Sequence, residues 1–170
     1  MSRYASIIKD DVVNGEGVCT SFWVQGCPLQ CIGCHNQDLW DFNGGIEYTD
    51  HTRWEIIKLI SANDIVRNFS ILGGEPLATQ NVPMVWEVVT TIRHAYPNIK
   101  IFLWTGFTFE QIIETKYYGA VKEILDAVDV LIDGPYIEEL RDLSLKFRGS
   151  SNQRVWIKKD GEWIDGKHNC

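Results

Sequence analysis

The feature of this sequence that most constrains its fold is an alternation of short apolar runs with amphipathic helical patterns. Four runs have the length and composition of buried strands: VCTSFWVQG (18–26), FSILGG (69–74), KIFLWTG (100–106) and DVLIDG (129–134). Strands that alternate with helices predict an α/β fold built on a parallel sheet with right-handed crossovers. Ligands gather at the carboxyl ends of the strands in such sheets, so we expect functional residues there.

Two stretches between these strands have helical patterns. The clearest helix follows Asn81 and ends before Pro97. Its apolar residues recur at three- and four-residue steps and share one face: Val82, Val85, Trp86, Val89, Ile92 and Tyr96. A second helix is predicted to begin at Thr108, where the Thr108 and Gln111 side chains can form a capping box. We expect Gly119 to break this second segment into two.

The length of the chain limits how much of a barrel these units can build. With 170 residues, 45% of them hydrophobic, the chain suits a single domain that spans residues 1–170. A complete eight-unit βα barrel takes about 250 residues, so we expect a partial barrel with a parallel sheet that is open on one side. The stretch RVWIKKDGEWI (154–164) predicts a small C-terminal hairpin around an Asp160-Gly161 turn.

Composition and charge exclude several classes of function. The formal net charge is −7, from 16 Lys and Arg against 23 Asp and Glu, so the chain offers no basic field for nucleic acid. The N-terminus has no apolar core of signal-peptide length, and no later stretch approaches the roughly 20 apolar residues of a membrane span. We therefore expect a cytoplasmic protein that binds neither nucleic acid nor membranes.

The five cysteines are distributed in a way that does not suit a disulfide framework. Three of them lie within one short stretch, which favours thiols that are free to bind metal in a reducing compartment. Cys19 falls within a predicted strand and Cys170 at the C-terminus, so core packing and an inert tail are the interpretations that suit these two residues.

The clustered cysteines are Cys27, Cys31 and Cys34, in GCPLQCIGCHN (26–36). Thiolates with the spacing Cys-x3-Cys-x2-Cys can converge on iron and sulfide, or on zinc if His35 supplies a fourth ligand. An ordinary electron-transfer 4Fe-4S cluster takes four thiolates, and here only three are adjacent. Our interpretation is a 4Fe-4S cluster with three cysteine-bound irons and a fourth iron open to a small molecule.

This spacing resembles the cluster motif of the radical S-adenosylmethionine (SAM) enzymes, in which the open iron chelates the amino and carboxylate groups of SAM. Further stretches are similar, in the same order, to one branch of that superfamily, the activating proteins of anaerobic ribonucleoside-triphosphate reductase. They are VNGEG (13–17), GC before the cluster loop, CHN after it, GGEP (73–76), WTG (104–106), DGPY (133–136) and FRGSSNQR (147–154). The similarity runs from about residue 5 to residue 157. Gly33 departs from the aromatic residue common in the superfamily, but glycine is common there in the activating branch.

The resemblance implies a fold, a reaction and partners. The fold would be the partial barrel of the radical SAM type. In this chemistry a reduced cluster gives one electron to the sulfonium of SAM, and homolysis yields methionine and a 5'-deoxyadenosyl radical. By resemblance, the radical removes a hydrogen atom from a glycine of the reductase large subunit and leaves a glycyl radical. An unidentified one-electron donor is implied, and no side chain beyond the cluster ligands is expected to be catalytic.

The resemblance also implies that the segment Gly73, Gly74, Glu75 and Pro76 binds the amino group of SAM. This segment follows a predicted strand, and its two glycines allow a close backbone approach that leaves carbonyl groups free as acceptors. We expect Glu75 to steady the loop instead of titrating. Taken alone, such a segment is also typical of an ordinary turn at the end of a strand.

Two other short segments are expected to contact the same ligand. Thr105 and Gly106 end the next strand and could contact its ribose or carboxylate, although a cap or turn before the following helix suits them equally. The resemblance places the backbone of Gly33, Cys34 and His35 against the adenine edge. His35 also suits a solvated loop histidine, and we do not expect it to be a catalyst.

Two motifs have no assigned role at this level. Asp133 could contact a ligand or form a turn, and the turn is the interpretation we prefer. The stretch 147–154 contains polar groups and Gly149 but few apolar anchors, so hydrogen bonds must order it. Its contact could be SAM, the cluster loop or a protein partner.

Three alternative functions remain open. An activator of another glycyl radical enzyme, such as pyruvate formate-lyase, would use the same chemistry, and detection of the radical on each candidate partner would separate the two. A short radical SAM enzyme of the deazaguanine-forming type would need no protein substrate. A zinc-stabilised binding module would contain zinc without sulfide.

Overall fold

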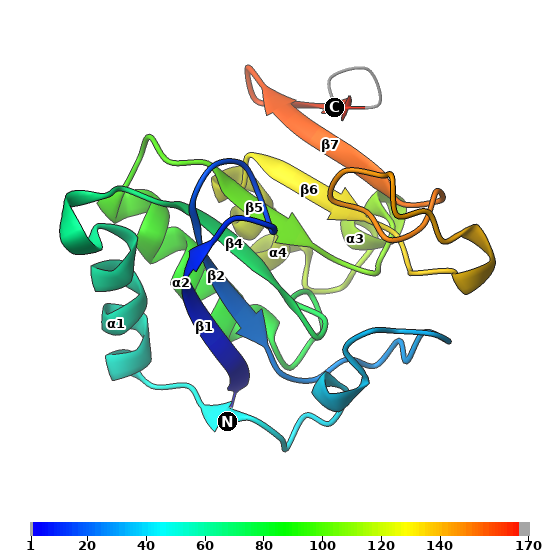
Figure 1. Ribbon diagram of the computed structural model, residues 1–170, viewed down its shortest axis with the longest axis horizontal. Coiled ribbons are helices and arrows are strands. Elements are labelled where there is room, and N and C mark those ends of the chain that lie inside the picture. The colour runs from blue at the N-terminus through cyan, green and yellow to red at the C-terminus, as the bar shows by residue number, and fades with distance from the viewer. Residues whose placement is uncertain (1, 167–170) are drawn as a thin grey trace.

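The computed structural model describes residues 2–166, which form one eight-stranded sheet packed against helices (Figure 1). The strands are β1 (Arg3–Asp11), β2 (Cys19–Val24), β3 (Ile46–Glu47), β4 (Asn68–Gly73), β5 (Ile101–Trp104), β6 (Val130–Asp133), β7 (Arg154–Lys159) and β8 (Glu162–Asp165). The α-helices are α1 (Asp50–Ile60), α2 (Val82–Ala95), α3 (Phe109–Ile113) and α4 (Tyr118–Ala127). Short 3-10 helices cover Gln37–Leu39, Ala62–Asp64 and Glu138–Leu140.

The centre of the sheet is parallel and its two flanks are antiparallel. The strand order is β3-β1-β2-β4-β5-β6-β7-β8, in which β2, β4, β5 and β6 pair in parallel. The predicted α/β class is therefore confirmed, and because β3 and β8 end the order at opposite edges, the sheet is not closed. Its description as a partial barrel of the radical SAM type, and as a single domain of residues 1–170, stays a prediction.

The sequence predicts some of the flanking strands and not others. The predicted C-terminal hairpin is confirmed as β7 and β8, whose connecting residues Asp160 and Gly161 both have positive φ, at 51° and 84°. Positive φ at both central residues is what a tight two-residue hairpin turn with the twist of the strands requires. The antiparallel strand β1 was not predicted. Its exposed positions are Ser6, Ile8 and Asp10, and its sequence contains no long apolar run.

The helices cover one face of the sheet. The main core cluster combines residues of β2, β4 and β5 with residues of all four α-helices. The predicted helix after Asn81 is confirmed as α2, whose buried side extends beyond the predicted apolar residues to Met84 and Val88, while Trp86 lies at its exposed margin. The Trp86 ring is 39% exposed, and its Nε1 donates to Glu123 of α4 at 2.5 Å.

The predicted start of α3 is confirmed, but the predicted break is misplaced. The Thr108 side chain accepts from the backbone N–H of Gln111, and the Gln111 side chain accepts from the N–H of Thr108, as a capping box requires. The break lies at residues 114–117, and Gly119 is inside the first turn of α4. Glycine is tolerated there because its N–H needs no partner within the helix.

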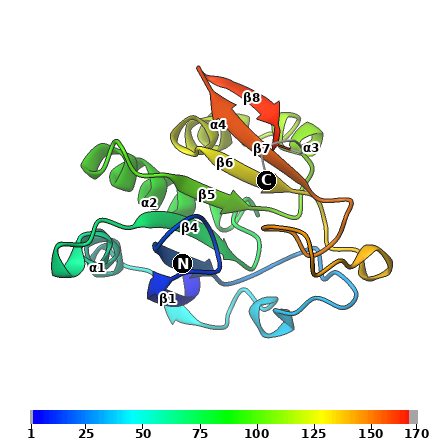
Figure 2. The same cartoon turned by 45° about the horizontal axis from the view of Figure 1, so that its top comes forward.

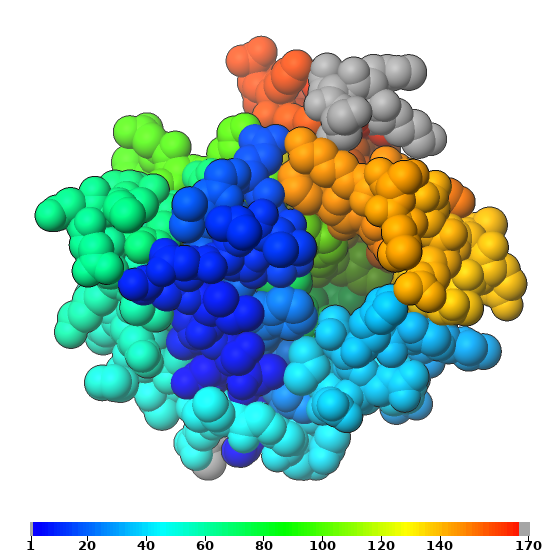
Figure 3. Space-filling model, viewed as in Figure 1, coloured from blue at the N-terminus to red at the C-terminus, as the bar shows by residue number. Residues whose placement is uncertain are grey.

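The loops that follow the parallel strands β2, β4, β5 and β6 lie together, beyond the carboxyl ends of these strands (Figure 2). The space-filling view is hollowed between the N-terminal segment in dark blue, the segment after β2 in light blue and the segment before β7 in orange (Figure 3). No helix within residues 2–166 combines the length and apolar character that a membrane span would need.

Candidate active site

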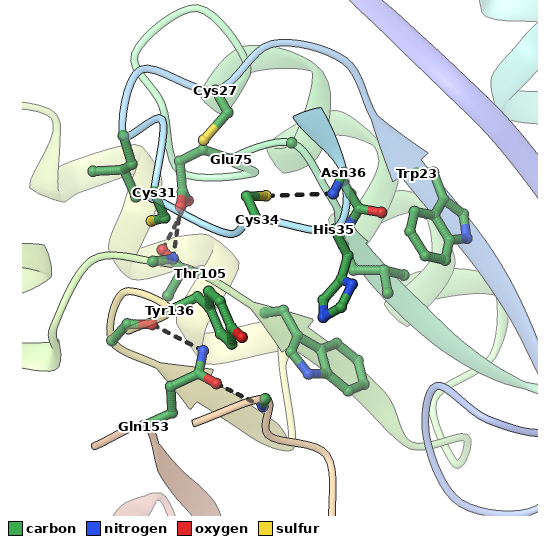
Figure 4. A pocket seen from close by; sticks show the side chains of 18 of the residues that line it. Trp23, Cys27, Cys31, Cys34, His35, Asn36, Glu75, Thr105, Tyr136 and Gln153 are labelled. Carbon is green, nitrogen blue, oxygen red and sulfur yellow. Dashed lines mark hydrogen bonds between the residues drawn. The ribbon is translucent and has the colours of Figure 1, made fainter. Parts of the chain in front are cut away.

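A cavity of about 350 Å³ lies beyond the carboxyl ends of the parallel strands. It brings together most of the predicted site residues (Figure 4). The three predicted metal ligands all line it, and we call them the cluster cysteines: Cys27, Cys31 and Cys34. The predicted ligand-binding residues that also line it are His35, Gly73, Gly74, Glu75, Thr105 and Gly106. Two predicted residues, Gly33 and Pro76, are not part of the lining.

The loop that carries the cluster cysteines is held at its start by the chain that follows it. Gly26 has a φ of 94°, and a Cβ at this position would lie 2.0 Å from the ring of Phe42, so only glycine fits. The N–H of Gly26 donates to the carbonyl of Leu39 at 2.8 Å, and the N–H of Cys27 donates to the carbonyl of Trp40 at 3.1 Å. Residues 37–42 therefore fix where the first cysteine enters the cavity.

The cluster cysteines differ in their surroundings. Burial raises the pKa of the Cys27 thiol, although backbone N–H groups of Leu29 and Gln30 oppose this shift. The sulfur of Cys34 accepts from the N–H of Asn36 at 3.4 Å, and the N–H of Cys34 donates to the carbonyl of Cys31 at 3.1 Å. All three thiols are partly exposed, so they are accessible to a metal from the cavity.

The donor set of the cavity fits an iron–sulfur cluster. Within the described part of the chain, no three His, Cys, Asp or Glu side chains meet closely enough to hold one metal ion. His35, the alternative fourth ligand for zinc, instead has its ring 5.9 Å from that of Tyr136. Three soft thiols that line one cavity are the ligand type that an iron–sulfur cluster takes.

Cys19 lies away from the cavity. Cys19 is fully buried in β2, and its Sγ donates to the carbonyl of Glu16 at 3.6 Å, which agrees with the predicted core position. The backbone of Gly15 packs directly over it, since a Cβ there would lie 2.5 Å from the Cys19 sulfur. Cys170 lies outside the described residues.

Glu75 joins the loop after β4 to the loop after β5. Its carboxylate is 1% exposed and accepts three hydrogen bonds, from Thr105 Oγ1 at 2.7 Å, from the N–H of Gly106 at 2.7 Å and from the N–H of Leu77 at 2.8 Å. Burial raises the pKa of Glu75 to about 7, while these three donors oppose the shift. Glu75 thus steadies the loop as expected, but its raised pKa differs from the expectation that it does not titrate.

The two glycines before Glu75 serve a close contact between loops. Gly73 has a φ of 107°, and a Cβ on Gly74 would lie 2.4 Å from the carbonyl oxygen of Gly26. The N–H of Gly74 donates to Val24 at 2.9 Å, and the N–H of Glu75 donates to Gly26 at 2.8 Å. The sequence suggested that these glycines let the backbone approach a ligand, and the structure adds that they let it approach the cluster loop.

Packing explains why position 33 is a glycine, and the sequence did not reveal this. Its φ is 76°, and a Cβ there would lie 2.2 Å from a carboxylate oxygen of Glu138. The same Glu138 oxygen accepts from the hydroxyl of Tyr136 at 2.6 Å. The segment after β6 therefore lies against the cluster loop and leaves no space for a side chain at Gly33.

Asp133 connects neighbouring helices and strands instead of lining the cavity. Its carboxylate is completely buried, accepts from the N–H of Phe109 at 2.6 Å and pairs with Arg154, whose Nε lies 3.0 Å away. It therefore connects β6 to the start of α3 and to β7. Both sequence interpretations, a turn former and a ligand contact, overlooked this buried ion pair.

The stretch 147–154 forms one wall of the cavity and is ordered by hydrogen bonds, as predicted. The Gln153 side chain accepts from the N–H groups of Gly149 at 2.8 Å and Ser150 at 3.2 Å, and donates to the carbonyl of Gly134 at 3.0 Å. Phe147, Gly149 and Gln153 line the cavity. The indole of Trp104 donates to the carbonyl of Phe147 at 2.8 Å and extends this wall.

Asn81 was predicted only as the residue before a helix, yet it is the polar residue that connects the two central loops. Its amide nitrogen donates to the carbonyl of Gly26 at 3.2 Å and to the carbonyl of Glu75 at 2.9 Å. The side chain is 1% exposed and makes no capping hydrogen bond to α2. No local pattern could have revealed it, because one of its two partners lies 55 residues away in the chain.

Comparisons with known proteins agree with this site. The family described as "4Fe-4S single cluster domain" matches residues 13–156, and this match defines a class of iron–sulfur proteins with one cluster. The anaerobic ribonucleoside-triphosphate reductase-activating protein of Escherichia coli (strain K12) is 37% identical over 154 residues, which cover 90% of this chain and 97% of the relative. The protein of the same name from Enterobacteria phage T4 is 36% identical over 161 residues, covering 95% and 97%. That from Vibrio cholerae serotype O1 is 36% identical over 154 residues, covering 90% and 96%.

This chain belongs to the family of anaerobic ribonucleoside-triphosphate reductase-activating proteins.

Proposed function

We propose that this protein activates an anaerobic ribonucleoside-triphosphate reductase by the reductive cleavage of SAM at a 4Fe-4S cluster. The observation that carries the proposal is that the three cluster cysteines share one cavity of about 350 Å³ with the loops after β4 and β5. When bound, the cluster supplies the electron that cleaves SAM and gives the 5'-deoxyadenosyl radical. The reductase large subunit is the protein substrate, on which a glycyl radical is left, and a separate one-electron donor reduces the cluster.

The cluster cysteines hold the inorganic group, and the loop after β4 holds the amino end of SAM. Carbonyl groups of the segment 73–76 other than that of Glu75, which already accepts from Asn81 and from the N–H of Ala78, are suitable acceptors for an ammonium group. A cation beside Glu75 also favours its ionised form, which burial alone disfavours. The negative charge of Glu75 would then attract the amino group without any proton transfer.

The main role of the loop after β5 is to orient Glu75. The Thr105 hydroxyl donates to Glu75, so it offers a ligand only its acceptor capacity. The N–H of Gly106 is likewise bonded to Glu75. We infer that Thr105 and Gly106 orient Glu75 and present their own backbone to the ribose or carboxylate of SAM, while the backbone of Gly33, Cys34 and His35 meets the adenine edge.

Part of the cavity wall is aromatic. Trp23, Trp104 and Phe147 line it on the side of the sheet opposite the α-helices. These rings make this part of the wall apolar, and the proposed reaction requires no acid or base from the protein. The cavity opens between three separate segments of chain (Figure 3), which suits a substrate that is itself a protein loop.

The test is anaerobic reconstitution with iron and sulfide, followed by electron paramagnetic resonance (EPR) of the reduced protein with and without SAM. We expect a 4Fe-4S signal that changes when SAM is added. Zinc without sulfide, or a cluster signal that is indifferent to SAM, would contradict the proposal. The Cys19→Ala variant is the matched control, because this cysteine is buried away from the cavity and its loss should leave the iron content unchanged.

A further inference from the structure

The amide of Asn81 is placed between the two loops on which the proposed chemistry depends. The carbonyl of Gly26 immediately precedes the first cluster cysteine, and the carbonyl of Glu75 belongs to the proposed SAM-binding loop. The Asn81 nitrogen lies 3.2 Å from the first of these oxygens and 2.9 Å from the second. One buried side chain therefore spans both loops at once.

The chemistry of this position suits a group with two donors. Both partners are carbonyl oxygens, which can only accept, and a primary amide supplies two N–H groups from one nitrogen. The carbonyl of Gly26 also accepts from the N–H of Glu75 at 2.8 Å, so three donated hydrogen bonds fix the two loops to each other. An aspartate at position 81 would have nearly the same shape but would present oxygens to oxygens.

A role in capping α2 does not explain this side chain. Asn81 occupies the N-cap position, but its backbone is already helical, with φ −94° and ψ −25°, and its side chain caps no helical N–H. The helix begins with Val82 and has Pro83 in its first turn, which reduces the number of N–H groups that need a cap. The hydrogen-bonding capacity of the amide is directed to the loops.

We propose that Asn81 is a positioning residue that sets the spacing between the cluster loop and the SAM-binding loop. The expected effect on SAM binding rests on the proposed function, in which SAM contacts the cluster and the loop after β4 at the same time. Loss of the amide donors would let the loops separate while the three cysteines remain on their own loop. The cluster would still form, and SAM would bind it poorly.

The experiment compares Asn81→Asp with Gln80→Glu, which makes the same change from amide to carboxylate at the exposed neighbouring position. Each protein is reconstituted anaerobically, its iron is counted, and its affinity for SAM is measured by titration of the EPR change. We expect Asn81→Asp to keep its iron and to bind SAM about tenfold more weakly, the fold-change for loss of two hydrogen bonds. Gln80→Glu should match the wild type. Equal affinities in the two variants would overturn the inference.

A second readout separates this inference from the proposed function. Hydrogen exchange of the metal-free protein reports the N–H of Glu75, which is bonded to Gly26. We expect at least tenfold faster exchange at this amide in Asn81→Asp than in Gln80→Glu, whether or not the protein binds SAM. Unchanged exchange would overturn the positioning role, and a wild-type cluster indifferent to SAM would instead contradict the proposed function.

If Asn81→Asp does not fold, Asn81→Ser replaces it, because a serine hydroxyl can donate to only one of the two carbonyls. It should bind SAM a few-fold more weakly than the wild type and show partly accelerated exchange at Glu75. A serine variant with wild-type affinity and wild-type exchange would also refute the proposal.

Discussion

The ion pair between Arg154 and Asp133 provides the sharpest test of how this fold holds the wall of its cavity. Asp133 is completely buried, and Arg154 meets it through two of its nitrogens. Arg154 also contacts both carboxylate oxygens of Glu110, at 3.0 and 2.8 Å, and its guanidinium lies 4.9 Å from the ring centre of Trp156. Among the described residues, replacing Arg154 with Leu would leave Asp133 with the N–H of Phe109 as its hydrogen-bond donor.

The expected cost follows from the burial of the carboxylate that remains. Removing one partner of a buried ion pair costs about 3–5 kcal/mol, because the other charge stays in the interior. The Arg154 side chain is 26% exposed, so water would partly solvate Asp133 after the substitution, and we expect the lower end, about 3 kcal/mol. For a chain of this length that corresponds to a fall in Tm of roughly 6–12 °C.

The assay is urea and thermal unfolding of the metal-free protein, with Lys122→Leu as the control. Lys122 pairs with Asp126 on the surface of α4, where both side chains are more than half exposed, so its loss should produce no measurable change. Adding Asp133→Asn to Arg154→Leu should restore part of the stability, since the buried charge is gone. If Arg154→Leu were as stable as the Lys122 variant, the buried pair would not stabilise this region and the reasoning would be refuted.

Three further predictions concern the cavity itself. Alanine at any one of the cluster cysteines should abolish SAM cleavage, and a variant with full turnover would remove that residue from the ligand set. Gly74→Ala should weaken SAM binding at least tenfold, because its Cβ would meet the carbonyl of Gly26. Gly119→Ala, whose Cβ would enter open space, should leave SAM binding unchanged. Equal SAM affinities of the two variants would contradict this prediction. Burial raises the folded pKa of Glu75 from 4.5 to about 7, so the folded protein binds more protons and loses stability as the pH rises through that window. Glu75→Gln should therefore reduce the loss of unfolding free energy between these pH values, and an unchanged pH dependence would show that Glu75 does not titrate there.

The parts of the fold that could be predicted are those determined by local patterns. Apolar runs marked the four parallel strands, and the Asp160-Gly161 turn marked the hairpin, because both follow from the preferences of consecutive residues. Strand β1 lacked such a pattern, since it pairs with β2 while polar and charged residues interrupt its apolar ones. Its existence depends on the tertiary pairing and not on its own composition.

The site could be predicted as a set of motifs but not as an assembly. The cysteine spacing and the glycines of the loop after β4 were visible in the sequence, because metal ligation and tight turns constrain neighbouring residues. The amide of Asn81 and the carboxylate of Glu138 act on residues 55 and about 105 positions away, through contacts that only the fold creates. Gly33 illustrates the difference: the sequence showed that a glycine was present, and the structure shows which side chain requires it.

The most direct test of the proposed function is to detect the product of activation on the partner. The reconstituted protein is mixed anaerobically with the anaerobic ribonucleoside-triphosphate reductase of the same organism, SAM and a chemical reductant, and EPR spectra are recorded. We predict a glycyl radical on the reductase that is absent without SAM and absent with any alanine variant of the cluster cysteines. A radical formed instead on pyruvate formate-lyase, or no radical on the reductase although SAM is cleaved, would contradict the account.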